Sequence, residues 1–204
     1  MTELTSPNLT AATLREISGL PAEPAALSAA TVIFIDYQNT YTRGVLELAG
    51  WQEALDKAAD LLARARAAGA TVLHVQHDGG TGSPYDLQQE IGQIHSRVVP
   101  IAGEQVVTKT APNAFVGTNL GDLVDAAGHR DVVIAGFMTH MCVTFTAEGA
   151  FLRGNAPTVV ADACATRPLP SAAGPTTAAE QHRVALATIG DLYAVVVPTA
   201  ADLR

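Results

Sequence analysis

Short apolar segments alternate with amphipathic segments along most of this chain. Six apolar segments, rich in β-branched residues, have the length of a strand and fall at 31–36, 70–76, 105–108, 131–135, 157–161 and 193–197. Four segments between them repeat apolar residues at helical spacing, at 51–68, 118–127, 142–153 and 178–189. Because the strands are nearly continuous apolar runs, we expect helices to cover both faces of their sheet. The pattern predicts a three-layer αβα, Rossmann-like α/β fold around a central six-stranded, mainly parallel sheet.

Two stretches fall outside this alternation. Residues 1–30 precede the first strand, and their apolar positions fit one side of a short helix that Pro21 and Pro24 end. We therefore expect an N-terminal arm over 1–30 and one domain over 31–204. The second stretch, 77–103, is long and contains several Gly, Ser and Pro residues, which is typical of a lid or specificity loop.

Composition limits the class of protein. The 204 residues are 48% hydrophobic and 16% charged, which supports one folded domain and argues against disorder. The net charge of −8 argues against a nucleic-acid partner. No apolar run approaches the roughly 20 residues of a membrane helix, and the N-terminus lacks the basic and apolar parts of a signal peptide. With only two cysteines as well, we expect a reduced, cytoplasmic protein without a membrane partner.

Three side chains that carry chemistry follow predicted strands. Ligands of open parallel sheets bind beyond the carboxyl ends of the strands, where Asp36, Lys109 and Cys142 are expected. A thiol at a helix N-terminus is expected to have a pKa below the ordinary value of about 8.5. By position alone, Cys142 fits a nucleophile and a packed small side chain equally well.

A cysteine nucleophile needs a base. His140 is two residues from Cys142, and such near neighbours on a turn generally point apart, which favours a loop or interface role for His140. A buried Asp36 with a raised pKa is an alternative base, unless it only caps its turn. Lys109 would then hold Asp36 in place and supply positive charge, unless it is solvated.

The segments around these residues resemble the motifs of one enzyme family, the isochorismatase-like cysteine hydrolases. Asp36-Tyr-Gln-Asn-Thr-Tyr41 is similar to the family's D-x-Q-N-x-F, with Tyr in place of Phe. Lys109-Thr-Ala-Pro-Asn-Ala-Phe115 is similar to K-x-x-x-S-x-F, with Asn where Ser is usual. Gly136-Phe-Met-Thr-His-Met-Cys-Val143 is similar to the nucleophile loop G-x-x-T-x-x-C-V. The resemblance extends from about Thr31 to Val197, with the motifs in the family's order.

This resemblance implies a catalytic triad of Asp36, Lys109 and Cys142. It also implies a cis peptide bond in the nucleophile loop, which by position joins Phe137 to Met138. The backbone N–H groups of Met138 and Cys142 would then form an oxyanion hole. The family resemblance further implies a homodimer or homotetramer.

The implied activity is hydrolysis of a non-peptide C–N bond: the thiol attacks a small-molecule amide and forms a thioester, with no cofactor. Isochorismatase activity, the hydrolysis of a vinyl ether, is an alternative, although the enzymes that perform it typically lack the thiol. A non-catalytic or redox-sensing protein on the same scaffold is a second alternative. The expected substrate pocket is apolar and equally compatible with ordinary packing; it comprises Tyr41, Phe115, Phe137 and Met138. A nicotinamide-like ring, a ureide, a maleamate-like acid and a lactam all remain possible substrates.

Several other polar residues have ordinary interpretations. Nicotinamidases of this family carry a zinc site with an Asp-x-His pattern that this chain lacks. Two histidines three residues apart at a strand end, such as His74 and His77, point to opposite faces and cannot readily bind one metal ion together. We therefore expect no metal site. The candidate ligands are then expected to be pocket or loop residues, namely His74, His77, Asp78 and His95. We expect Cys164 to be a structural thiol. Arg167 is expected to be a solvent-exposed loop charge, with carboxylate binding as its alternative.

Overall fold

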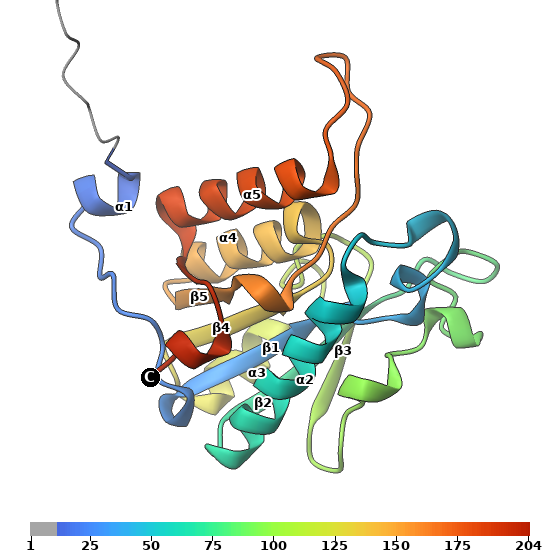
Figure 1. The fold of residues 1–204 in the computed structure, drawn as a ribbon. Helices are drawn as coiled ribbons and strands as arrows, with labels where there is room; N and C mark the ends of the chain where they lie inside the picture. The colour runs from blue at the N-terminus through green and yellow to red at the C-terminus, as the bar shows by residue number, and fades with distance from the viewer. Residues whose placement is uncertain (1–11) are drawn as a thin grey trace, which may run out of the picture.

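A single parallel sheet forms the middle layer of the computed structural model, which describes residues 12–204 (Figure 1). Its strands lie in the order β3-β2-β1-β4-β5-β6, and every adjacent pair is parallel. Their bounds are β1 (Ala30–Ile35), β2 (Thr71–His77), β3 (Gln105–Lys109), β4 (Asp131–Gly136), β5 (Ala156–Val160) and β6 (Val195–Val197). The predicted six-stranded fold is confirmed, and the strand order reverses between β1 and β4.

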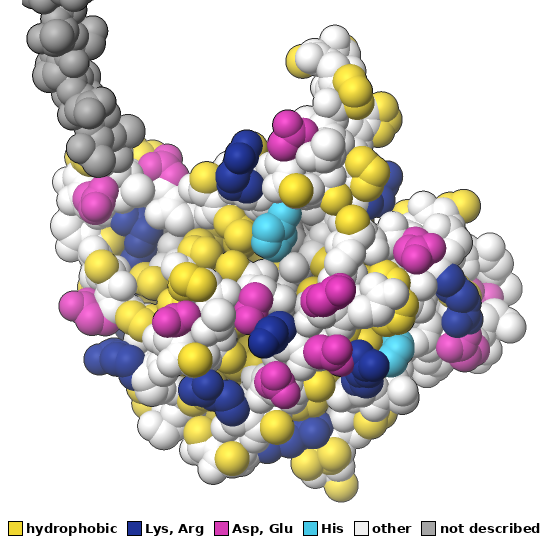
Figure 2. Space-filling view, viewed as in Figure 1, with side chains coloured by type: hydrophobic (Ala, Val, Ile, Leu, Met, Phe, Trp, Pro, Cys, Tyr) yellow, Lys and Arg dark blue, Asp and Glu magenta, His cyan; other side chains and the backbone are white. Residues whose placement is uncertain are grey.

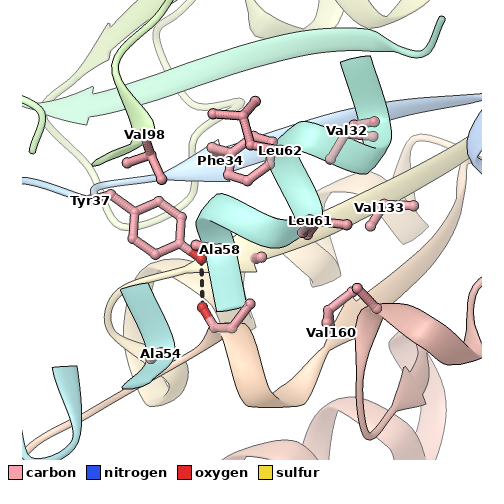
Figure 3. Close-up of a cluster of buried hydrophobic side chains, with 14 of the residues drawn as sticks. Val32, Phe34, Tyr37, Ala54, Ala58, Leu61, Leu62, Val98, Val133 and Val160 are labelled. Carbon is pink, nitrogen blue, oxygen red and sulfur yellow. Dashed lines mark hydrogen bonds between the residues drawn. The ribbon is translucent and has the colours of Figure 1, made fainter. Parts of the chain in front are cut away.

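Helices cover both faces of the sheet. The long helix α2 (Trp51–Ala67) packs its small and aliphatic residues on one face, where Leu61 and Leu62 meet β1 (Figure 3). Helices α3 (Leu120–Ala127) and α4 (Thr144–Leu152) cover the opposite face, and α5 (Ala178–Thr188) lies beside α4 (Figure 1). None of the helices within residues 12–204 has both the length and the apolar character needed to cross a bilayer.

Wide turns change the bounds of two predicted elements, and α3 also begins two residues later than predicted. The sixth strand has only three residues, because the chain before it forms a wide π-helical turn at Ile189–Tyr193. A similar turn, Thr139–Val143, precedes α4, so this helix begins two residues later than predicted. Cys142 therefore lies in the turn that leads into the helix.

The segments outside the sheet are also partly defined. Within the predicted arm, the short helix α1 (Leu14–Ile17) follows Thr13, and Leu14 donates its N–H to Asp191. Residues 1–11 lie outside the described part of the chain, and the division into arm and domain stays a prediction. The segment 168–177 projects from the body as a hairpin closed by pairing of Leu169 with Thr176 (Figure 1).

Acidic and basic side chains intermingle on the face of the molecule that Figure 2 shows.

The close contact of β1 with β4 requires a glycine. A Cβ atom on Gly136 would lie 2.3 Å from the carbonyl oxygen of Ile35, far inside van der Waals contact. The bare glycine lets the next residue, Phe137, donate its N–H to that same oxygen at 3.0 Å. The segment that follows β4 is thus tied to the end of β1, where the strand order reverses.

Candidate active site

The three side chains that follow β1, β3 and β4 meet in one buried place. Lys109 Nζ lies 2.6 Å from Asp36 Oδ2 and 3.3 Å from Cys142 Sγ. The side chains of Asp36 and Lys109 are 0% exposed, and Cys142 is 5% exposed. The structure therefore brings together the acid, the ammonium and the thiol that the sequence singled out.

A left-handed turn places the Asp36 carboxylate. Asp36 has φ 52°, a conformation that Asp tolerates better than most residues because its short polar side chain fits it. Its N–H donates to the carbonyl of Val75 on β2, and its carbonyl accepts the N–H of Gln38 at 2.7 Å. The turn ends β1 abruptly and leaves the carboxylate beside Lys109.

Burial dominates the charges of this cluster. It raises the pKa of Asp36, and the neighbouring Lys109 and a hydrogen bond from the Cys142 thiol oppose that effect only in part. Burial lowers the pKa of Lys109, but Asp36 and Cys142 outweigh it and leave that pKa raised. Lys109 is therefore an ammonium at neutral pH.

The thiol of Cys142 is protonated in the resting site. Burial, followed by the charge of Asp36, raises its pKa to about 12, although Lys109 acts in the opposite direction. The expectation of a lowered thiol pKa is wrong: the turn before α4 buries the sulfur next to a carboxylate, and this outweighs any effect of the helix terminus. The thiol must lose its proton to a neighbour during a reaction.

The nucleophile loop has the backbone that the resemblance implied. The peptide bond between Phe137 and Met138 is cis, as predicted. The carbonyl of Met138 accepts the N–H groups of Met141 and Val143, and the N–H of Thr139 donates to Ala165 at 3.0 Å. Binding of an oxyanion by the N–H groups of Met138 and Cys142 stays a prediction.

Aromatic residues surround the cluster, but not all of them are equally accessible. Tyr41 is 1% exposed, and burial is the main cause that raises its pKa. Phe137 is fully buried with its ring edge against Tyr37, whose hydroxyl donates to Ala163 (Figure 3), so it packs the core.

The other two predicted pocket residues differ in environment. Met138 is 7% exposed at the nucleophile loop. Phe115 is half-buried with the Arg153 guanidinium 5.3 Å above its ring.

The segment 77–103 contributes a residue to the site. Tyr85 donates or accepts a 2.9 Å hydrogen bond with the Tyr41 hydroxyl, and burial together with Cys142 and Asp36 raises its pKa. His95 of the same segment instead packs beside Trp51. Tyr85 thus lies beside Tyr41, and a role of the segment as a lid or specificity loop stays a prediction.

His77, which was expected to be a pocket or loop residue, lies beside the Lys109 ammonium. His77 is the last residue of β2 and pairs in register with Lys109 of β3; its Nδ1 lies 3.2 Å from Lys109 Nζ. Strand adjacency is what could have revealed it, because β2 lies between the strands that carry Lys109 and Asp36. His74 instead bonds to Glu104, and no group of three potential metal ligands occurs in the described part of the chain.

Three further residues have separate surroundings. His140 Nδ1 bonds to the Thr166 hydroxyl, consistent with a loop role. The buried Cys164 thiol donates to the Val160 carbonyl. The interpretation of Arg167 as a solvent-exposed charge is wrong: it is half-buried, and its Nε has no hydrogen-bond partner among residues 12–204.

Comparison with known proteins gives consistent matches over nearly the whole chain. The family described as Isochorismatase domain matches residues 30–201. The crystal structure of an isochorismatase from Pseudomonas putida superposes with a TM-score of 0.92 at 38% identity, covering 95% of this chain and 100% of that one.

Two curated relatives are similar at the level of sequence. The secreted isochorismatase effector of Verticillium dahliae is 33% identical over 184 residues, covering 90% of this chain and 95% of the relative. A streptothricin hydrolase of Streptomyces noursei is 34% identical over 204 residues, covering 98% of this chain and 75% of the relative.

Proposed function

This chain belongs to the isochorismatase family of hydrolases, and on that premise we propose that it is a cysteine hydrolase that cleaves a C–N amide bond of a small molecule. The observation that carries the proposal is the contact of one buried ammonium, Lys109, with both the Asp36 carboxylate and the Cys142 sulfur. A thiol in this position supplies a nucleophile, the carboxylate a base, and the ammonium a counter-charge for both.

The first half of the reaction forms a thioester. Asp36 takes the proton of the Cys142 thiol, and the sulfur attacks the amide carbonyl carbon. The backbone N–H groups of Met138 and Cys142 bind the resulting oxyanion. Asp36 then gives its proton to the amide nitrogen, the C–N bond breaks, and ammonia or an amine leaves.

The second half releases the acid. Asp36, again a carboxylate, takes a proton from a water molecule that attacks the thioester carbon. The C–S bond breaks, the carboxylic acid product leaves, and the sulfur of Cys142 recovers its proton. Lys109 keeps its charge throughout and stabilises whichever neighbour is negative.

Two observations support this chemistry. Burial raises the pKa of Asp36, which suits a group that must accept a thiol proton and later donate it. Relatives of this chain include proteins named streptothricin hydrolase and ureidoacrylate amidohydrolase.

The test is an activity screen over primary amides, ureides and lactams, with isochorismate included. We expect the wild-type protein to hydrolyse at least one amide-type compound and Cys142→Ala to hydrolyse none of them while keeping its melting temperature. Cys164→Ala is the matched control, since its thiol bonds only to a backbone carbonyl and should leave turnover in place. Full amide hydrolysis by Cys142→Ala, or hydrolysis of isochorismate alone, would contradict the proposal.

Three broader features stay predictions. They are the homodimer or homotetramer, the cytoplasmic location, and the absence of any cofactor.

A further inference from the structure

We infer that His77 is a positioning residue: by accepting a hydrogen bond at Nδ1, it holds the Lys109 ammonium in contact with Asp36 and Cys142. The inference rests on the proposed function, because it assigns His77 a role in placing the charge that this reaction uses. Its basis is the 3.2 Å contact between His77 Nδ1 and Lys109 Nζ.

The ammonium has three protons and three acceptors. Asp36 Oδ2 lies at 2.6 Å from Nζ, His77 Nδ1 at 3.2 Å and Cys142 Sγ at 3.3 Å. A lysine ammonium only donates, so Nδ1 of His77 must be unprotonated and the ring proton must sit on Nε2. Without the imidazole, one buried N–H of Lys109 would lose its acceptor, and Nζ would be free to turn away from the sulfur.

The fold fixes the backbone of His77, and one neighbouring ring packs against its imidazole. Gln38, which is 0% exposed, accepts the backbone N–H of His77 at 2.8 Å and donates to its carbonyl at 2.9 Å. Gln38 also donates to the carbonyl of Gly92 at 2.7 Å. The ring of Tyr85 packs against the imidazole with centroids 4.7 Å apart and an edge-on geometry. These contacts fix the position of the His77 backbone and limit the movement of its ring.

The groups around His77 keep it neutral. Burial and the Lys109 ammonium lower its pKa to about 4, while Asp78 on the same segment acts in the opposite direction. The remaining titratable neighbour, Tyr85, is a neutral phenol whose pKa is itself raised by burial. Protonation of His77 in acid would remove the acceptor and set two cations side by side.

The test compares His77→Asn, His77→Gln and His77→Ala. The Asn amide oxygen takes the place of Nδ1, whereas the Gln amide reaches the place of Nε2, so only Asn keeps the acceptor where Lys109 needs it. We expect kcat to fall about 10- to 100-fold in the Ala and Gln variants, as for loss of a charged hydrogen bond, with KM changed far less. His77→Asn should retain most of kcat and lose the part of the acid limb that arises from protonation of His77, while the part that arises from protonation of Asp36 remains. His95→Asn, on the same segment but beside Trp51, is the matched control.

A second readout separates this inference from the proposed function. The pH dependence of Cys142 alkylation by iodoacetamide needs no substrate and reports the charge next to the sulfur. We expect the Ala and Gln variants to change that profile and the Asn variant to preserve it above pH 5. If Asn performs no better than Gln, or if Ala keeps full kcat and the wild-type profile, the inference fails even when Cys142→Ala is inactive. If no amide is hydrolysed but alkylation changes as expected, the proposed function fails and the role of His77 stands.

Discussion

Replacing Lys109 by Met tests the electrostatic basis of the site. Met matches the length of the lysine stem but removes the charge, so it leaves the Asp36 carboxylate buried without its counter-ion. Both side chains of the pair are 0% exposed and their charged atoms are 2.6 Å apart. Breaking such a buried pair costs about 3–5 kcal/mol, because the remaining charge stays desolvated. At ~2–4 °C per kcal/mol for a chain of this size, the melting temperature should fall by about 6–20 °C.

The sign of the pH dependence identifies the cause. Burial already raises the pKa of Asp36, and loss of Lys109 removes the charge that opposes this effect. An acid whose folded-state pKa lies above its unfolded value binds a proton more readily when folded, so folding gains stability as the pH falls through that range. The deficit of Lys109→Met relative to wild type should therefore shrink in acid. In Asp36→Asn/Lys109→Met no unpaired charge remains, and most of the lost stability should return without any return of activity.

The assay is urea unfolding at pH 7 and pH 5, which gives the free energy of unfolding of the wild type, Asp36→Asn, Lys109→Met and the double variant. The reasoning is refuted if Lys109→Met lies within about 0.5 kcal/mol of wild type at pH 7, well below the cost of an unpaired buried charge. It is equally refuted if the double variant is the least stable of the four.

Other predictions concern the framework around the site. Gly136→Ala should unfold at a far lower temperature than the wild type or fail to fold, because its Cβ would lie 2.3 Å from the Ile35 carbonyl oxygen. Gly190→Ala is the control, since its Cβ would meet only a side chain at 3.4 Å. Equal melting temperatures of the two variants would contradict the packing argument. The pKa of Glu104 is lowered to about 2, mainly by a hydrogen bond from Arg66. The Glu104 carboxylate should therefore stabilise the fold above pH 4.5, and this stabilisation should be lost as the pH falls toward 2. Thermal melts across this range should show a steeper loss for wild type than for Glu104→Gln, and parallel curves would count against it.

The sheet and the catalytic trio were accessible from the sequence for a simple reason. Strands buried on both faces are continuous apolar runs, so the residue that ends each run marks the edge where ligands bind. Asp36, Lys109 and Cys142 all follow such runs. The structure places the Asp36 carboxylate at ion-pair distance, and the Cys142 sulfur at hydrogen-bonding distance, from Lys109 Nζ. Residue order placed the three side chains at this edge, whereas their assignment as a catalytic triad came from the family resemblance and stays a proposal.

The sequence did not indicate which strands and loops lie next to one another in the folded structure. The role of His77 depends on β2 lying between β1 and β3, and Tyr85 reaches the site only through the folding of a long loop. The raised pKa of Cys142 depends on its burial next to Asp36, which no local pattern encodes. Arg167 was misjudged as well, because its partial burial cannot be read from the residues beside it in the sequence.

Mass spectrometry of the acid-quenched protein, taken during turnover of an amide found in the activity screen, tests the central claim most directly. The account predicts a mass increase equal to the acyl group, confined to the peptide that contains Cys142 and absent from Cys142→Ala. Product formation at an undiminished rate in Cys142→Ala, with no acyl adduct on the wild-type thiol at any quench time, would contradict it.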